Sequence, residues 1–209
     1  NFEAIDFGYI PGEYKMPDPK GYDFAQWKQI YTRWDSAFLD KGWGTIYLAN
    51  HDQPRMLTRW GNDTPEFRDY SSQLLTTFIL SMRATAFYYF GDEIGMNNIK
   101  FDRVDQYNDV ELLTNYEQVK AKGGDLKRFL EGMKISSRDN GRTPMQWDTS
   151  KNAGFGTGTP WLPVNGNYTT VNVTAQDKDP TSVLNYFRAM QKLRKENEVL
   201  VYGKYTLVD

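Results

Sequence analysis

Residues 45–55 of the chain are Thr-Ile-Tyr-Leu-Ala-Asn-His-Asp-Gln-Pro-Arg, a short apolar run followed at once by a polar cluster that ends in Pro-Arg. The apolar part, residues 45–50, has the length and composition of a buried strand. In parallel α/β folds, functional side chains gather at the carboxyl ends of the strands. The stretch therefore predicts a site at Asn50, His51 and Asp52.

Two amphipathic helices flank this strand. Apolar residues recur at helical spacing over residues 24–40, after a capping Asp23 and before Gly42. The same spacing returns over residues 67–82. Both helices are expected to lay one apolar face on a core.

Further strands are expected on both sides. Residues 84–90 form a near-continuous apolar run that predicts a buried strand. Residues 1–9 alternate between apolar and polar side chains, which predicts another strand. The order strand, helix, strand, helix, strand predicts an α/β fold with a parallel sheet and right-handed crossovers. Since a closed barrel of this kind needs eight strands, three strands indicate only a portion of one.

The remainder of the chain leaves this regular alternation. Residues 91–181 form a long polar excursion with expected helices near 109–122 and 125–132. Ser182 is expected to cap a last helix. Residues 200–208 are expected to form a strand that belongs to a further domain. We therefore expect barrel residues at 1–199, including the excursion, and the start of a second domain at 200–209.

Composition excludes several classes of function. With 25 Lys and Arg against 27 Asp and Glu, the net charge is −2, and no basic field is available for binding nucleic acid. No cysteine and one histidine exclude thiolate and multi-histidine metal sites. No apolar run is long enough to predict a membrane span. The absence of cysteine suits a cytoplasmic location, and a periplasmic one remains open.

The cluster at residues 50–55 has the chemistry of sugar recognition. An imidazole and a carboxylate at a strand end can bind adjacent hydroxyls with charge-assisted hydrogen bonds. A lone histidine is more often structural, but the neighbouring Asp52 favours a functional His51. Arg55 either lines the same cleft or pairs with an acid from a neighbouring loop.

Other acidic groups are expected to be structural. Asp102, Asp105 and Asp109 lack the spacing of a calcium loop, and a solvated face is expected there. Asp92 and Glu93 follow Gly91 at the end of a strand, where they are expected to cap a turn or bind an arginine.

Three motifs together resemble one family. Leu-Ala-Asn-His-Asp-Gln-Pro-Arg at 48–55, Phe-Gly-Asp-Glu-Ile-Gly-Met at 90–96 and Ser-Arg-Asp-Asn-Gly-Arg-Thr-Pro-Met-Gln-Trp-Asp at 137–148 are similar to the alpha-amylase superfamily, glycoside hydrolase family thirteen. The branch resembled is that of oligo-1,6-glucosidases and α-glucosidases.

The resemblance implies a position within the family's fold. Residues 1–9, 45–50 and 84–90 would be strands six to eight of a TIM (β/α)8 barrel, with a long excursion after strand eight. Residues 182–195 would form the last barrel helix, and the end of the chain would begin a C-terminal β-sandwich domain.

The resemblance also implies a reaction. It is the retaining hydrolysis of α-glucosidic bonds at the non-reducing end of short oligosaccharides such as isomaltose and maltose. Asp52 would be the carboxylate that stabilises the transition state, and His51, Arg138 and Arg55 would bind substrate. For Arg138, an ion network with Asp139 and Arg142 is the alternative.

The same resemblance places some parts of the enzyme elsewhere. The nucleophile and the acid/base would lie upstream of residue 1, in a missing N-terminal barrel half, so these 209 residues are expected to be inactive alone. No cofactor or metal is expected among these residues. Calcium, which relatives often bind in the first βα loop, would belong to the absent part.

Alternatives remain within and beyond hydrolysis. A sucrose isomerase or transglucosylase of the same family usually carries an Arg-Leu-Asp-Arg-Asp stretch after strand six, and residues 7–13 lack it. Such isomerases usually have Asn where this chain has Gln53. A non-catalytic relative that binds a protein partner, or a fragment that only binds sugar, is the third kind of function. The choice between 1,6 and 1,4 linkages stays open.

Overall fold

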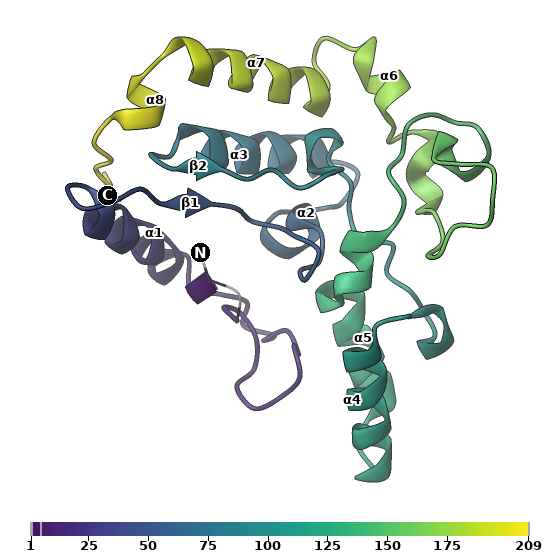
Figure 1. The fold of residues 1–209 in the computed structure, drawn as a ribbon. Coiled ribbons are helices and arrows are strands. Elements are labelled where there is room, and N and C mark those ends of the chain that lie inside the picture. The colour runs from purple at the N-terminus through teal and green to yellow at the C-terminus, as the bar shows by residue number, and fades with distance from the viewer. Residues whose placement is uncertain (1, 5, 209) are drawn as a thin grey trace.

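Two short parallel strands, β1 (Thr45–Ile46) and β2 (Thr85–Ala86), lie side by side at the centre of the computed structural model, which describes residues 2–4 and 6–208 (Figure 1). Thr45 is in register with Thr85, and Ile46 with Ala86. The expected parallel pairing is therefore confirmed. Within the described ranges these are the only strands, and both are shorter than expected, because a ladder extends only as far as both strands are paired.

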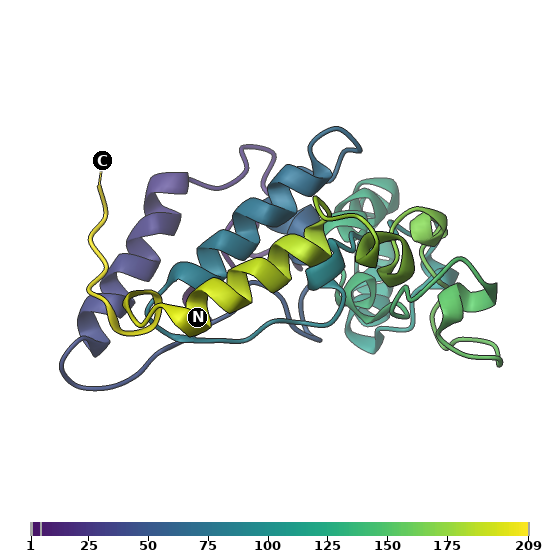
Figure 2. The ribbon, with the colours of Figure 1, turned by 90° about the horizontal axis from the view of Figure 1, so that it is seen from above.

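Three long helices run beside the strands. They are α1 (Phe24–Phe38), α3 (Arg68–Ser81) and α7 (Val183–Glu196), and they lie next to one another in the view from above (Figure 2). The capping residues are those predicted, since the side chain of Asp23 accepts from Ala25 N and that of Ser182 from Asn185 N. Each cap satisfies one of the free N–H groups at its helix start.

The main core fills the space between these helices and the strands. Aromatic rings lie close together in it, with centroids of Trp27 and Phe78 4.6 Å apart and those of Trp27 and Tyr31 4.7 Å apart. Ile79 and Leu80 of α3 are 1% exposed. Phe, Trp and Tyr make up 15% of the chain, and many of these aromatic side chains pack in this core.

The excursion forms a second body of packed structure. In Figure 1, α4 and α5 project away from the strands. Apolar side chains from these helices and from the loop around Met16 form a separate core with Phe101, Leu112, Phe129 and Met133. The expected helices are present, the second one reaching four residues further than predicted. The elements of this region are α4 (Val110–Ala121), α5 (Leu126–Ser136), α6 (Val173–Asp177) and the 3-10 turns η2 (Asp92–Ile94), η3 (Val104–Gln106), η4 (Arg138–Arg142), η5 (Lys151–Gly154) and η6 (Gly166–Thr169).

The strand expected at residues 1–9 is wrong for the described residues. They form a 3-10 turn, η1 (Phe2–Ala4), and an isolated antiparallel bridge between Tyr9 and Pro17. Gly8 has a φ of 83°, which turns the chain back before an extended strand can continue. Residues 1 and 5 lie outside the described ranges.

Two further strand predictions need correction. Residues 199–202 form a short helix, α8 (Val199–Tyr202), and Tyr202 packs against Trp43 with ring centroids 5.6 Å apart. No described segment offers residues 200–208 a strand to pair with. The run 84–90 is not buried on both sides, since Phe87 is 57% exposed while Tyr88 packs on Phe187. The helices cover only one face of it.

The remaining helix, α2 (Met56–Trp60), follows the polar cluster directly and is almost wholly buried. It anchors the end of that cluster in the main core. Among the helices in the described ranges, none combines the length and the apolar character that crossing a bilayer requires.

Candidate active site

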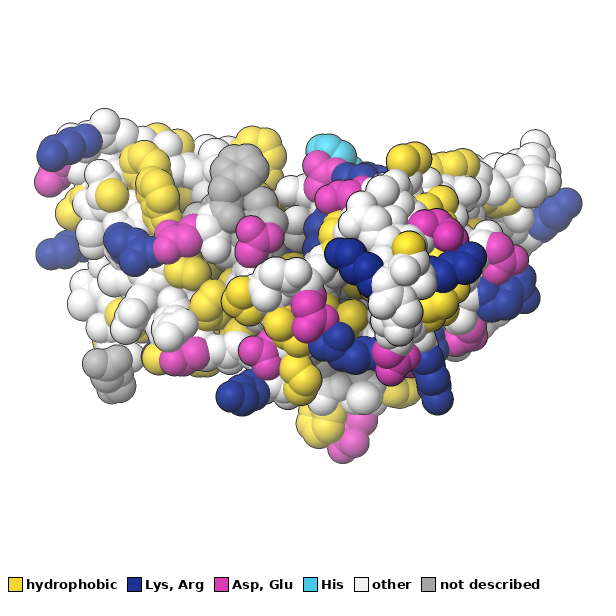
Figure 3. Space-filling view, turned by 90° about the horizontal axis from the view of Figure 1, so that it is seen from below, with side chains coloured by type: hydrophobic (Ala, Val, Ile, Leu, Met, Phe, Trp, Pro, Cys, Tyr) yellow, Lys and Arg dark blue, Asp and Glu magenta, His cyan; other side chains and the backbone are white. Residues whose placement is uncertain are grey.

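The loop that leaves β1 presents His51 and Asp52 to solvent. The side chain of Asn50 accepts a hydrogen bond from Asp52 N at 2.8 Å and so holds a tight turn. Asp52 is half exposed, and His51 is 74% exposed. The histidine, cyan in Figure 3, lies at the surface beside acidic and basic side chains. Both predicted residues are therefore open to a ligand.

Two arginines reach the same carboxylate from a distant part of the sequence. Arg138 Nη1 and Arg142 Nη2 lie 3.2 Å and 3.3 Å from Asp52 Oδ1. His51 Nε2 lies 3.2 Å from the other oxygen, Oδ2. The structure thus brings together Asp52, His51 and Arg138, all of them predicted from the sequence. Arg142 was considered only as part of an ion network, and it contacts Asp52 as well.

A buried carboxylate fixes Arg138. Arg138 Nε and Nη2 donate to Asp109 at 2.7 Å and 2.6 Å in a bidentate pair. Burial raises the pKa of Asp109, but the hydrogen bonds and charge of Arg138 outweigh this and hold that pKa below its ordinary value. The hydrogen bonds with Asp109 in turn raise the pKa of Arg138. Arg138 is therefore charged and oriented, with its Nη1 turned towards Asp52.

The ion network of Arg138 differs from the one predicted. Arg142 Nη1 pairs with Asp139 at 3.3 Å, whereas Arg138 pairs with Asp109, which leaves one edge of the Arg138 guanidinium facing Asp52. The expectation of a solvated acidic face is wrong for Asp109, which is 2% exposed. It holds for Asp102 and Asp105, whose side chains are exposed and paired with Lys134 and Arg103.

The loop that carries the two arginines lies directly on the loop that carries Asp52. Asp139, a residue of η4, is buried and accepts from the N–H groups of Asn108 and Asp109 at 2.7 Å and 2.9 Å. Gly141 meets the carbonyl of Gln53 so closely that a Cβ there would collide with it. Only a glycine allows this approach of the two backbones.

Arg55 is placed differently from its prediction. Its side chain has no exposed surface, and it donates to the carbonyls of Phe90 and Thr143. A group without exposed surface offers no atom to a ligand, so the expectation that Arg55 binds substrate directly is not supported. Its contacts fit a role in fastening loops, although the partners are carbonyls rather than the acid expected.

Lys15 is a neighbour of the site that the sequence did not single out. The surrounding loop is fixed to α5 by an ion pair of Glu13 with Arg128 at 2.6 Å and by Tyr14 stacked on Phe129. Lys15 has a φ of 42°, an uncommon conformation for a residue other than glycine, and its ammonium lies 5.6 Å from the centroid of the Tyr14 ring. Burial lowers the pKa of Lys15, and the charge of Asp52 is among those that raise it. A positive φ at a lysine has no signature in sequence.

Asp92 and Glu93 lie under the site rather than in it. Asp92 is 2% exposed, and burial raises its pKa to about 8, although the charge of Arg55 acts in the opposite direction. Oδ1 of Asp92 has no hydrogen-bond partner among the described residues. Burial also raises the pKa of Glu93, and hydrogen bonds of its carboxylate with the backbone at Glu93 and Gly91 oppose this. The structural role expected for them agrees with this burial.

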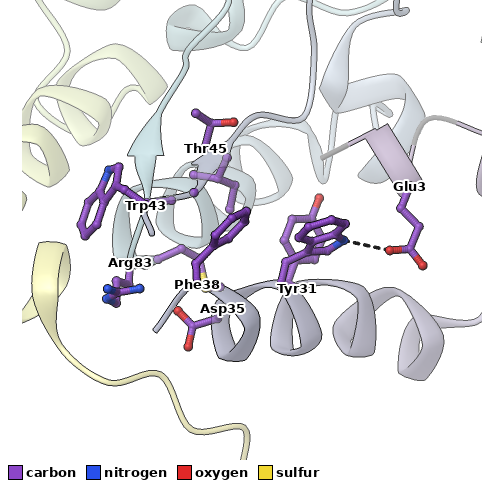
Figure 4. A pocket seen from close by; sticks show the side chains of 12 residues that line it. Glu3, Tyr31, Asp35, Phe38, Trp43, Thr45 and Arg83 are labelled. Carbon is purple, nitrogen blue, oxygen red and sulfur yellow. Dashed lines mark hydrogen bonds between the residues drawn. The ribbon is translucent and has the colours of Figure 1, made fainter. Parts of the chain in front are cut away.

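A separate apolar pocket lies at the other ends of the strands (Figure 4). Its walls include Tyr31, Phe38, Trp43 and Arg83, and at its edge the indole of Trp34 donates to Glu3 at 2.9 Å. Both residues of β1 line the pocket, and its lining includes no residue of the segment 50–55. It is therefore distinct from the polar cluster. Within the described ranges, no group of three or more His, Asp or Glu side chains is placed to hold a metal ion.

Comparison with known proteins matches almost the whole chain. A family model described as the catalytic domain of alpha amylase matches residues 1–203. An oligo-1,6-glucosidase of Parageobacillus thermoglucosidasius is 43% identical over 208 residues, which are 99% of this chain and 36% of the relative. A trehalose-6-phosphate hydrolase of Bacillus subtilis is 38% identical over 209 residues, 100% of this chain and 37% of the relative.

Solved structures give the same picture. A mutant isomaltulose synthase from Erwinia rhapontici, in complex with sucrose, matches with a TM-score of 0.95 at 37% identity, covering 100% of this chain and 37% of that one. The chain thus spans a little over a third of the length of the relatives that it matches.

Proposed function

This chain belongs to the alpha-amylase family, and on that premise we propose that it forms part of the active site of a retaining α-glucosidase. The proposed substrates are short oligosaccharides of the isomaltose and maltose type, cleaved at the non-reducing end. Residues around β1 and β2 would belong to strands seven and eight of the barrel, with the polar cluster at their carboxyl ends.

Asp52 is the residue on which the proposal depends. A half-exposed carboxylate at a strand end, held by two arginines, is suited to accept hydrogen bonds from two sugar hydroxyls. In the oxocarbenium-like transition state the ring carries positive charge, and a fixed carboxylate then binds more strongly than it does in the ground state. His51 and Arg138 would bind the same sugar ring.

Retention also needs a nucleophile and an acid/base. Within the described ranges, no acid stands in the family's motif for either group. We assign both roles to the part of the catalytic domain that the relatives have beyond this match, and we assign none to Asp92 or Glu93. The isolated 209 residues are accordingly proposed to lack turnover.

Sucrose isomerisation is the second candidate. The structural similarity to isomaltulose synthase favours it, whereas residues 7–13 lack the Arg-Leu-Asp-Arg-Asp stretch that would retain fructose for a second attack. Sucrose separates the two activities, because a hydrolase releases glucose and fructose and an isomerase releases a rearranged disaccharide.

The test uses the complete gene product that contains this chain. Release of glucose from isomaltose, maltose and sucrose is measured for the wild type, for Asp52→Asn and for Asp105→Asn, which changes an exposed acid paired with Arg103. We expect Asp52→Asn to lose at least about 100-fold in kcat, the scale of removing one transition-state contact. Asp105→Asn should match the wild type. A wild-type rate in Asp52→Asn would overturn the proposal.

A further inference from the structure

Arg55 joins three segments that are far apart in the sequence. Its Nη1 donates to the carbonyl of Phe90, and its Nη2 to the carbonyl and the hydroxyl of Thr143 at 3.2 Å and 3.4 Å. Its backbone N–H donates to Asn98 Oδ1 at 3.0 Å. A planar guanidinium can donate in two directions at once, which a lysine ammonium on its flexible stem does not reproduce.

The surroundings of Arg55 are shaped to hold it. The rings of Phe90 and Tyr89 lie 4.8 Å and 5.8 Å from its guanidinium carbon, within the range of cation–π attraction. Gly91 has a φ of 89°, and a Cβ there would stand 2.7 Å from Arg55 Nη1. The glycine therefore leaves the space that the guanidinium occupies. Burial lowers the pKa of Arg55, and the charges of Asp92, Tyr89 and Glu93 act in the opposite direction.

The segments that Arg55 links also hold the residues of the candidate site. Asp52 stands three residues before Arg55 in the same loop, and Thr143 directly follows η4, which carries both arginines that contact Asp52. Arg142 Nε also donates to the carbonyl of His51 at 2.8 Å. Arg55 thus belongs to the loop that holds Asp52 and donates to Thr143, the residue after the turn that holds the arginine partners of Asp52.

We propose that Arg55 is a positioning residue that fixes the loop 138–143 so that Arg138 and Arg142 orient the carboxylate of Asp52. The inference rests on the role proposed for Asp52. It assigns Arg55 no contact with substrate. A displacement of about 1 Å around a reacting centre can cost about 100-fold in rate. A buried side chain that fixes the position of Arg138 and Arg142 relative to Asp52 can therefore affect kcat without touching substrate.

The experiment compares two buried arginines in the complete gene product. Arg55→Met and Arg55→Lys are matched with Arg194→Met, because Arg194 also donates to buried carbonyls, those of Leu80, Met82 and Ala84, but at the amino ends of the strands. For each variant, kcat and KM are measured on isomaltose, and amide hydrogen exchange is followed in residues 138–143.

The expected result separates positioning from general stability. Arg55→Met should lower kcat at least about tenfold, change KM by less than about threefold and speed exchange in residues 138–143. Arg194→Met should lower the melting temperature without either change. Arg55→Lys, which keeps the charge, should recover stability but only part of kcat. In an Arg138→Met background, Arg55→Lys should lower kcat by a smaller factor than it does in the wild type, because one of the two arginines through which it acts is gone.

Failure of this inference and failure of the proposed function would give different results. If Arg55→Met and Arg194→Met lose kcat in proportion to stability and exchange at 138–143 is unchanged, Arg55 is structural only and the inference fails. If Arg55→Met does not fold, the test uses Arg55→Lys in its place. The inference then fails if Arg55→Lys lowers kcat by the same factor in the wild type and in the Arg138→Met background. If the wild type cleaves none of isomaltose, maltose and sucrose, the proposed function fails, and hydrogen exchange alone then decides whether Arg55 fixes the loop.

Discussion

Arg138 Nη1 lies 3.2 Å from Asp52 Oδ1, although 86 residues separate the two in the sequence. The remaining edge of the same guanidinium is taken by Asp109, so the side chain cannot turn away without breaking a bidentate pair. One arginine therefore connects a buried anion with an exposed one. Because Asp109 holds Arg138 in place, Arg138 in turn holds the exposed carboxylate of Asp52 in one orientation.

The first prediction concerns the loss of Arg138. Arg138→Met leaves Asp109 in a buried position without its partner, and such a loss destabilises a protein by about 3–5 kcal/mol. Arg103→Met, which removes the exposed partner of Asp105, should change stability by less than about 1 kcal/mol. Denaturant unfolding of both variants checks this, and equal effects would mean that the pair with Asp109 adds no stability.

The second prediction is the pH dependence of the same pair. The folded pKa of Asp109 lies below its ordinary value, so the pair stabilises the fold above the unfolded pKa near about 4 and loses this effect as pH falls through the folded pKa. The difference in unfolding free energy between the wild type and Asp109→Asn should shrink from pH 6 to pH 3. A constant difference over that range would contradict the pairing.

The third prediction concerns Asp92, whose contribution to stability falls, and does not rise, as the pH increases. Burial raises the folded pKa of Asp92 to about 8, so the folded state holds a proton that the unfolded state has already lost above about pH 4. Stability from this group is complete below that pH and falls as pH rises towards 8, by at most about 1.4 kcal/mol per pH unit. Asp92→Asn should remove this slope between pH 4 and 8. A variant as sensitive to pH as the wild type would show that Asp92 is not its source.

The fourth prediction tests the main core. Ile79 is 1% exposed in the last turn of α3 and belongs to the same core cluster as Leu48 and Trp27. Ile79→Val should cost about 0.5–1.5 kcal/mol and Ile79→Ala about 2–5 kcal/mol, because the second substitution leaves a larger cavity. Chemical denaturation gives both values. A loss below about 1 kcal/mol for alanine would mean that the site collapses around the smaller side chain.

The helices could be predicted because their signals are local. Apolar spacing gave α1, α3 and α7, and the capping residues Asp23 and Ser182 marked two of their starts. Strand lengths could not be predicted in this way, since a ladder depends on the segment that pairs with it. Residues 200–208 have strand-like composition, yet with no described strand beside them they form a helical turn and an irregular tail.

The site was only partly predictable. Asp52 and His51 stand out because a polar cluster ends an apolar run, and Arg138 joined them through the resemblance of its motif. The pair of Arg138 with Asp109 was missed because its two residues are 29 positions apart and nothing local marks Asp109 as buried. The burial of Arg55 was missed for a similar reason, since it depends on Phe90 and Thr143 from distant loops.

The rate of the Asp52→Asn variant of the complete gene product on isomaltose tests the central claim most directly. If Asp52 stabilises the transition state, kcat falls at least about 100-fold, while the melting temperature stays within a few degrees because the side chain is half exposed. A variant that folds normally and keeps the wild-type kcat would contradict the account.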